Sequence, residues 1–69
     1  MDDKNWTLVF TTNKLFQAEI IKQILENNGI ETVIMNKQDS SYFTFGDVEV
    51  YVLAGSEMVA KKLIEEAAI

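Results

Sequence analysis

The 69-residue chain lacks cysteine, histidine and arginine. Without cysteine or histidine it can form no disulfide and no zinc site of thiolate or imidazole ligands. It can also form no Ser-His-Asp triad and no Cys-His pair. Without arginine, bidentate recognition of phosphate or carboxylate is lost, and lysine or backbone N–H groups must replace it. These absences exclude catalysis by a Ser-His-Asp triad or a Cys-His pair and zinc bound by thiolate or imidazole, and the acidic residues that remain show no calcium-loop pattern. We therefore expect a protein that is not an enzyme and that holds no metal or cofactor.

The chain also lacks an excess of positive charge and any long apolar run. Six lysines against eleven acidic residues give a formal net charge of −5, which is unsuited to neutralising a string of phosphates. No apolar run approaches the roughly 20 residues that span a bilayer. The acidic N-terminus, residues 1–4, lacks the basic and apolar regions of a signal peptide. We expect a cytoplasmic protein that binds neither nucleic acid nor membrane.

What the chain does have is the composition of a folded domain, with 48% hydrophobic and 25% charged residues. Its length allows one domain over residues 1–69. A chain this short buries only roughly 60% of the surface that it exposes when unfolded, so small domains often gain stability from a partner subunit. Because disulfides and the common zinc sites are excluded, a homodimer is an open possibility.

Three segments have the pattern of strands, and they are residues 6–11, 30–36 and 48–52. In the first, the alternation predicts that Trp6, Leu8 and Phe10 share one apolar face. The second is short and β-branched. In the third, valines alternate with Glu49 and Tyr51, which predicts one buried face.

Two segments have a helical period, and they are residues 14–28 and 57–68. The buried stripe of the first is expected to comprise Leu15, Phe16, Ala18, Ile20, Ile21, Ile24 and Leu25. That of the second is expected to comprise Val59, Ala60, Leu63, Ile64 and Ala67. Thr12 or Asn13 is expected to cap the first helix, and Gly29 to end it in the left-handed conformation. Glu57 and Lys61 are spaced to form an ion pair on the second helix.

The order β-α-β-β-α with amphipathic helices predicts an α+β fold. We expect a two-layer ferredoxin-like sandwich, with a three-stranded antiparallel sheet and both helices on one face. Strand 48–52 would lie between the other two, which leaves strand 6–11 as an open edge. That edge either pairs with another chain or is blunted, for example by a bulge, and both alternatives stand.

Several short motifs resemble the putative prokaryotic signal transducing protein family, a group of small bacterial domains of unknown function. They are Phe10-Thr11-Thr12-Asn13, Ala18-Glu19-Ile20-Ile21, the stretch from Leu25 to Ile30, Asn36 to Tyr42, Val48 to Leu53, and Ala60 with Leu63-Ile64. The resemblance implies a ferredoxin-like fold related to PII-type nitrogen regulators, and a signalling role. It implies no ligand and no catalytic residues, and the nucleotide-binding residues of PII proteins cannot be mapped onto this chain.

The predicted topology brings the turn after strand 6–11 and the loop after strand 30–36 to the same end of the sheet. The candidate ligand-binding residues at this end are Thr12, Asn13, Asn36, Lys37, Asp39, Ser40, Ser41 and Tyr42. Free N–H groups at the start of the first helix favour an anion there, and Lys14 and Lys37 add positive charge. The alternative interpretation is ordinary helix capping and turn chemistry.

Two functions follow from these patterns. The first is a regulatory module that senses a small molecule at this end of the sheet. The second is an interaction domain that docks a partner protein, or a second copy of itself. The docking would use the edge of strand 6–11, the face of the sheet, or the aromatic residues Phe43 and Phe45 in the loop that precedes strand 48–52.

Overall fold

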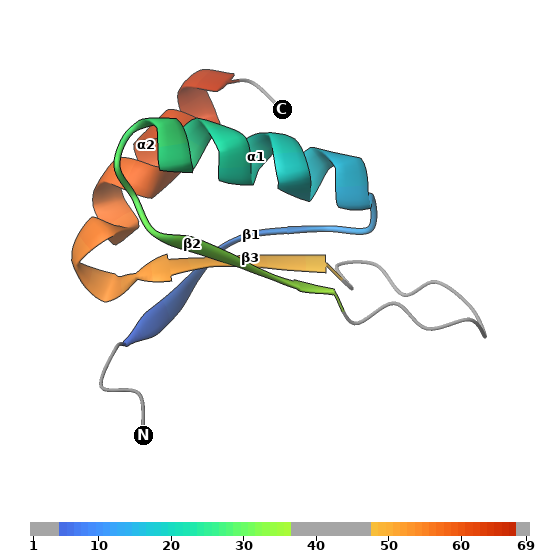
Figure 1. The fold of residues 1–69 in the computed structure, drawn as a ribbon, viewed down its shortest axis with the longest axis horizontal. Helices are drawn as coiled ribbons and strands as arrows, with labels where there is room; N and C mark the ends of the chain where they lie inside the picture. The colour runs from blue at the N-terminus through green and yellow to red at the C-terminus, as the bar shows by residue number, and fades with distance from the viewer. Residues whose placement is uncertain (1–4, 37–47, 68–69) are drawn as a thin grey trace.

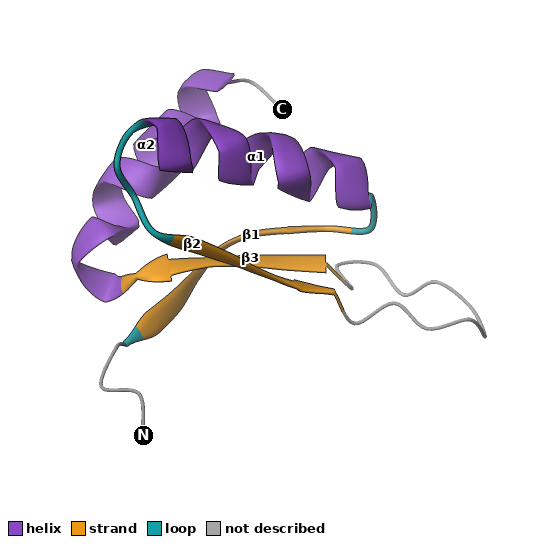
Figure 2. Ribbon diagram, in the orientation of Figure 1, coloured by secondary structure: helices purple, strands orange, loops and turns teal. Residues whose placement is uncertain are grey.

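A computed structural model describes residues 5–36 and 48–67 of the chain. Its elements are β1 (Trp6–Thr12), α1 (Leu15–Asn27), β2 (Thr32–Asn36), β3 (Val48–Leu53), the short 3-10 helix η1 (Ala54–Ser56) and α2 (Glu57–Ala67). The predicted order and the α+β class are confirmed, and the fold is compatible with a ferredoxin-like sandwich. Figure 2 shows the two layers, one of helices and one of strands.

The sheet has the order β1-β3-β2, with β3 antiparallel to both of its neighbours. β1 and β2 therefore run in the same direction and form the two edges of the described sheet. Both helices lie on one side of it (Figure 1). This is the predicted arrangement. α1 forms the crossover between the parallel strands β1 and β2, which places it against one face of the sheet. α2 lies against the same face.

α1 ends in a Schellman motif, which turns the chain back toward the sheet. Gly29 has φ 78, a left-handed conformation that costs glycine nothing sterically. The N–H of Gly29 donates to the carbonyl of Glu26, and the N–H of Ile30 donates to the carbonyl of Leu25, each at 3.0 Å. Leu25 and Ile30 are both buried, as the hydrophobic contact of this motif requires. Gly29 thus ends α1 as predicted.

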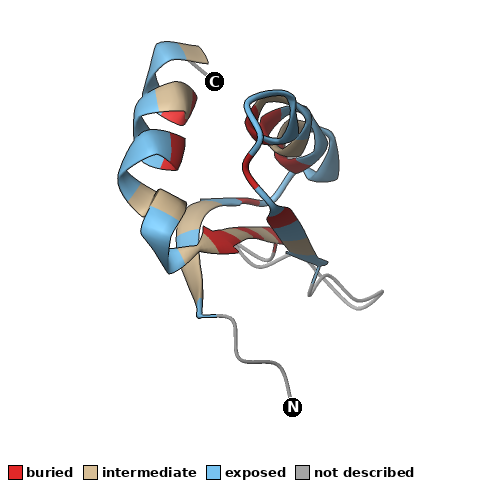
Figure 3. Ribbon diagram, turned by 60° about the vertical axis from the view of Figure 1, so that its left-hand side comes forward, coloured by how far each residue is buried: buried red, intermediate tan, exposed pale blue. Residues whose placement is uncertain are grey.

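The core lies between the helices and the sheet (Figure 3). Its buried hydrophobic residues are Ala18, Ile21, Leu25, Ile30, Val48, Val50, Val52, Ala60 and Ile64. The apolar stripes predicted for the helices were too wide, because Phe16 and Ile20 on α1 are 61% and 45% exposed. Val59 on α2 is exposed as well. Successive helical residues point about 100° apart, so a helix on a flat sheet buries only the residues beneath it.

A β-bulge in β1 changes which residues face the helices. Leu8 pairs with Tyr51 and Phe10 pairs with Val50, so Val9 is an extra residue between two consecutive β3 positions. Phe10 therefore shares the helix-covered face with Val50, whereas Leu8 lies on the opposite face with Tyr51. The prediction that Trp6, Leu8 and Phe10 share one face was wrong, since one inserted residue reverses the alternation beyond it.

Ile20 and Ile21 offer a matched test of this packing. Ile21→Val removes one methylene from a side chain with no exposed surface and should lower the free energy of unfolding by about 1 kcal/mol. Ile20→Val makes the same change at a 45% exposed position and should change it by less than about 0.5 kcal/mol. Urea unfolding followed by circular dichroism measures both. Equal losses in the two variants would contradict the packing.

Candidate functional site

The sheet face opposite the helices is mostly apolar and partly exposed. We call this surface the open face and define it by its six central side chains, which are Trp6, Leu8, Val33, Met35, Glu49 and Tyr51. The pairing places them together, because Tyr51 lies between Leu8 and Val33 while Glu49 lies beside Met35. Leu8, Val33 and Met35 are 40%, 39% and 47% exposed. No element among residues 5–36 and 48–67 covers this face (Figure 1).

A hollow of about 370 Å³ lies on the open face and is lined by Trp6, Val33, Met35 and Tyr51. These residues come from all three strands, so the hollow spans the width of the described sheet. Its volume lies within the roughly 300–1,000 Å³ of typical binding pockets. Its lining is aromatic and aliphatic, which suits an apolar or aromatic group.

One charged residue lies on the open face beside this hollow. The hydroxyl of Tyr51 donates a hydrogen bond of 2.8 Å to Oε1 of Glu49. Both residues are partly exposed, and both alternate along β3 with valines that are fully buried. The bond fixes the carboxylate against the ring that also lines the hollow, so an apolar site and an acidic group lie next to each other.

The sheet face is one of the docking surfaces expected from the sequence, and the strand pattern contains a further signal that its outer side is apolar. Four of the five residues of Trp6–Phe10 are apolar, as are all three of Val33–Met35, and such runs are typical of strands that are covered on both faces. Two helices on one side cover only one face. An apolar second face therefore follows from combining the strand pattern with the two-layer architecture.

The candidate ligand-binding residues that the structure describes lie at one end of the sheet, as predicted. Thr12 on β1 and Asn36 on β2 are both paired with Val48 of the central strand, so two strand spacings, about 10 Å, separate their backbones. Asn13 is exposed in the turn that follows β1. The remaining candidates, Lys37, Asp39, Ser40, Ser41 and Tyr42, lie outside the described residues, as do Phe43 and Phe45.

Thr12 has a structural role at this end of the sheet. It is buried, and its hydroxyl donates to Oε1 of Gln17 at 2.7 Å. The backbone N–H of Lys14 donates to the same hydroxyl oxygen at 3.1 Å. The predicted cap at Thr12 or Asn13 was wrong in its position, because the N-cap is Lys14 and has no side-chain capping bond. The Thr12 side chain instead closes the turn that precedes α1, as in a Ser/Thr turn.

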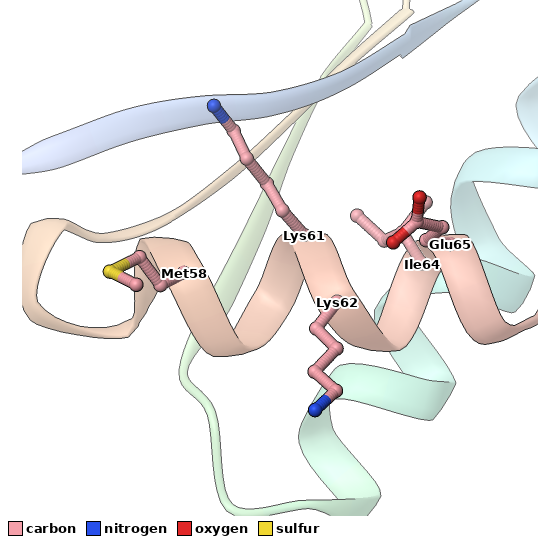
Figure 4. Close-up of a pocket in the computed structure, with 5 residues that line it drawn as sticks. All are labelled: Met58, Lys61, Lys62, Ile64 and Glu65. Carbon is pink, nitrogen blue, oxygen red and sulfur yellow. The ribbon is translucent and has the colours of Figure 1, made fainter.

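A second hollow lies on the exposed surface of α2 and is lined by Met58, Lys61, Lys62, Ile64 and Glu65. Figure 4 shows that Lys61 and Lys62 point in opposite directions from the helix, so no set of polar groups converges on one position. Lys61 forms the predicted ion pair with Glu57, with Nζ and Oε2 3.0 Å apart. Lys61 also lines a groove along residues 8–11 of β1.

Neither a metal-binding cluster nor a membrane-spanning helix is found in the part of the chain that the structure describes. Within residues 5–36 and 48–67, no three acidic side chains lie close enough together to hold a metal ion. Neither described helix is long and apolar enough to cross a lipid bilayer.

Comparison with known proteins adds one finding. Residues 6–68 match the family described as putative prokaryotic signal transducing protein. No curated protein and no solved structure matches the chain. The match covers every described helix and strand, including the whole open face.

The role of Thr12 can be tested with an isosteric change. Thr12→Val removes the hydroxyl but keeps the shape of the side chain, and it leaves the Lys14 N–H without its acceptor. We expect the free energy of unfolding to fall by about 1–2 kcal/mol. Thr11→Val, at the exposed neighbouring position, should change it by less than about 0.5 kcal/mol. Unchanged stability of Thr12→Val would contradict the structural role.

Proposed function

Because the chain belongs to the family of putative prokaryotic signal transducing proteins, we propose that it is a non-enzymatic signalling module that docks a partner protein on its open face. The observation that carries this proposal is the apolar sheet surface left bare by the described helices. Contiguous apolar surface of this kind marks interaction sites on soluble domains. Trp6, Tyr51 and Met35 also belong to residue types that are enriched in protein interfaces.

The edge of β1 is a poorer docking surface than the open face. The bulge at Val9 interrupts the regular ladder of β1, and Lys61 of α2 lies along residues 8–11 of that strand. Bulges and lysines are two of the ways in which proteins prevent edge-to-edge pairing. A homodimer through β1 stays a prediction, which light scattering tests by the concentration dependence of the mass.

Two valines allow a matched test of docking. Val33→Lys places a charge on the open face, whereas Val59→Lys makes the same change on exposed α2, and both positions are already exposed. We expect Val33→Lys to reduce the amount of co-purifying partner at least tenfold, because burying an unpaired lysine costs more than about 1.4 kcal/mol. Val59→Lys should retain the partner. Quantitative affinity purification from the native cells measures both.

As a control for correct folding, thermal melts should show that both variants unfold near the melting temperature of the wild type. Equal retention of partner by Val33→Lys and the wild type would contradict docking on the open face. Loss of the partner in both lysine variants would also contradict docking on the open face, because the loss would then not depend on which surface carries the lysine.

A second candidate function is the binding of a small anionic ligand at the Val48 end of the sheet. The observation that favours it is the shared pairing of Thr12 and Asn36 with Val48, which puts the end of β1, just before α1, and the end of β2 at the same end of the sheet. The relation to PII-type regulators, which the resemblance implies, stays a prediction. It ranks second because the Thr12 hydroxyl is already engaged within the turn.

Thermal-shift measurements test this second function. Inorganic phosphate, nucleotides and common dicarboxylates are the probes, and a ligand present at ten times its Kd should stabilise the chain by about 1.4 kcal/mol. For a domain of this size that is a rise of several degrees in Tm. Asn36→Ala should remove the shift, and Val33→Lys should keep it. If no probe raises the Tm, or if Asn36→Ala keeps the shift, ligand sensing at this end is contradicted.

A further inference from the structure

β2 forms the other edge of the described sheet, and its sequence does not protect that edge. It pairs with β3 in a regular register over Thr32–Asn36, without a bulge. It contains no lysine, no proline and no other charged side chain, although charges, proline and bulges are the usual means of preventing edge-to-edge pairing. β2 thus differs from β1, where a bulge and Lys61 protect the edge.

The hydrogen-bonding pattern indicates which backbone groups of β2 point out of the sheet. The N–H of Ala54 donates to the carbonyl of Asn5 at 2.8 Å, so the even-numbered residues of β3 turn their backbone groups toward β1. The odd-numbered residues of β3 therefore turn theirs toward β2. Because odd-numbered residues of β3 pair with odd-numbered residues of β2, the N–H and C=O groups of Thr32 and Ile34 point away from the sheet.

The flank of α1 above the β2 edge carries a row of charges of alternating sign. Glu19, Lys22 and Glu26 each follow a buried residue of α1, so they share one side of the helix. On α2, Lys61 follows the buried Ala60 in the same way and lies along β1, on the outer flank of that helix. The two helices follow antiparallel strands and lie on the same face of the sheet. The corresponding side of α1 is therefore its own outer flank, toward β2.

We propose that β2 pairs with the β2 of a second copy, antiparallel and centred on Val33, so that the two sheets join into one. Thr32 of each chain and Ile34 of the other exchange N–H···O bonds in both directions. The two Val33 residues face each other as a non-hydrogen-bonded pair, in which side chains lie closest. The contact uses the same residues on both chains and closes on itself, so it yields a dimer and not a fibre.

The charged row on α1 favours a second copy as the occupant of this edge. The twofold axis of the dimer brings the outer flanks of the two α1 helices together in antiparallel directions. The row reads negative, positive, negative, so each Lys22 approaches the acids of the other row, which makes the row complementary to itself. The formal net charge of −5 opposes the encounter, but at physiological ionic strength charges more than about 8 Å apart are largely screened.

Pairing of β2 also enlarges the open face. Three strands of about 20 Å cover roughly 300 Å² in projection, whereas a standard stable interface uses about 800 Å² from each partner. Two open faces side by side form one continuous apolar surface of roughly 600 Å² with the two Val33 side chains at its centre. The dimer itself does not depend on docking, which the co-purification experiment decides separately.

The chain has no cysteine, so single cysteine substitutions test the pairing directly. Val33→Cys should form a disulfide between two chains under mild oxidation, because the Cα atoms of a non-hydrogen-bonded pair lie about 4.5 Å apart, within the range of disulfides. Leu8→Cys is the matched control on β1, since Leu8 is 40% exposed and Val33 is 39% exposed. Non-reducing electrophoresis should show disulfide formation at least about tenfold faster for Val33→Cys, because pairing raises the effective concentration of the two thiols.

Two charge variants test the row on α1, and sedimentation equilibrium of the full chain measures the dissociation constant of the dimer. Lys22→Glu makes the row wholly acidic and should weaken the dimer at least about threefold. Lys62→Glu makes the same change of net charge on α2 and should change the dissociation constant by less than about twofold.

Three results would contradict the proposed dimer. A sedimentation mass that stays that of one chain at every concentration would overturn it. Disulfide formation by Leu8→Cys as fast as by Val33→Cys would also overturn it, and faster formation by Leu8→Cys would assign the contact to β1. Equal weakening by Lys22→Glu and Lys62→Glu would overturn the role of the charged row, because only the net charge would then matter.

Discussion

The sheet of this domain has two apolar faces, and the described helices cover one of them. The covered face is built on Val48, Val50 and Val52 of β3, which have no exposed surface and form the floor of the core. Burial of such side chains is the main favourable term in folding, so the helices must stay on this side. The other face carries aromatic and aliphatic side chains that the fold itself does not bury. The proposed docking function depends on this asymmetry.

The bulge at Val9 links the two faces. Without the inserted residue, regular alternation would keep Trp6, Leu8 and Phe10 on one side of β1. With it, Phe10 packs against the core while Leu8 lies beside Tyr51 on the open face. The same irregularity bends and twists an edge strand, which disfavours pairing along β1. One residue thus divides the apolar side chains of β1 between the two faces and disfavours pairing along the neighbouring edge.

Much of the fold could be predicted from the sequence, because its main signals are local. The β-α-β-β-α order, the Schellman ending at Gly29 and the Glu57–Lys61 pair all depend on residues close together in the chain. The face assignments could not be predicted as well. The bulge depends on how β1 pairs with a strand some 40 residues away, and the exposure of Phe16 and Ile20 depends on which side of α1 faces the sheet. The sheet face was expected only as one of three docking surfaces. Its residues were not predicted because they come from three separate segments, each of which resembles an ordinary core strand.

Two exposed methionines allow a direct measurement of the central claim, which is that the open face is occupied when the protein functions. Met35 lies on that face and is 47% exposed, and Met58 lies on α2 and is 86% exposed. Oxidation to the sulfoxide depends on exposure, and a brief pulse of oxidant followed by mass spectrometry gives its extent at each methionine. Our account predicts that the ratio of Met35 to Met58 oxidation falls clearly in living cells relative to the purified chain. An identical ratio in cells and in purified protein would contradict it.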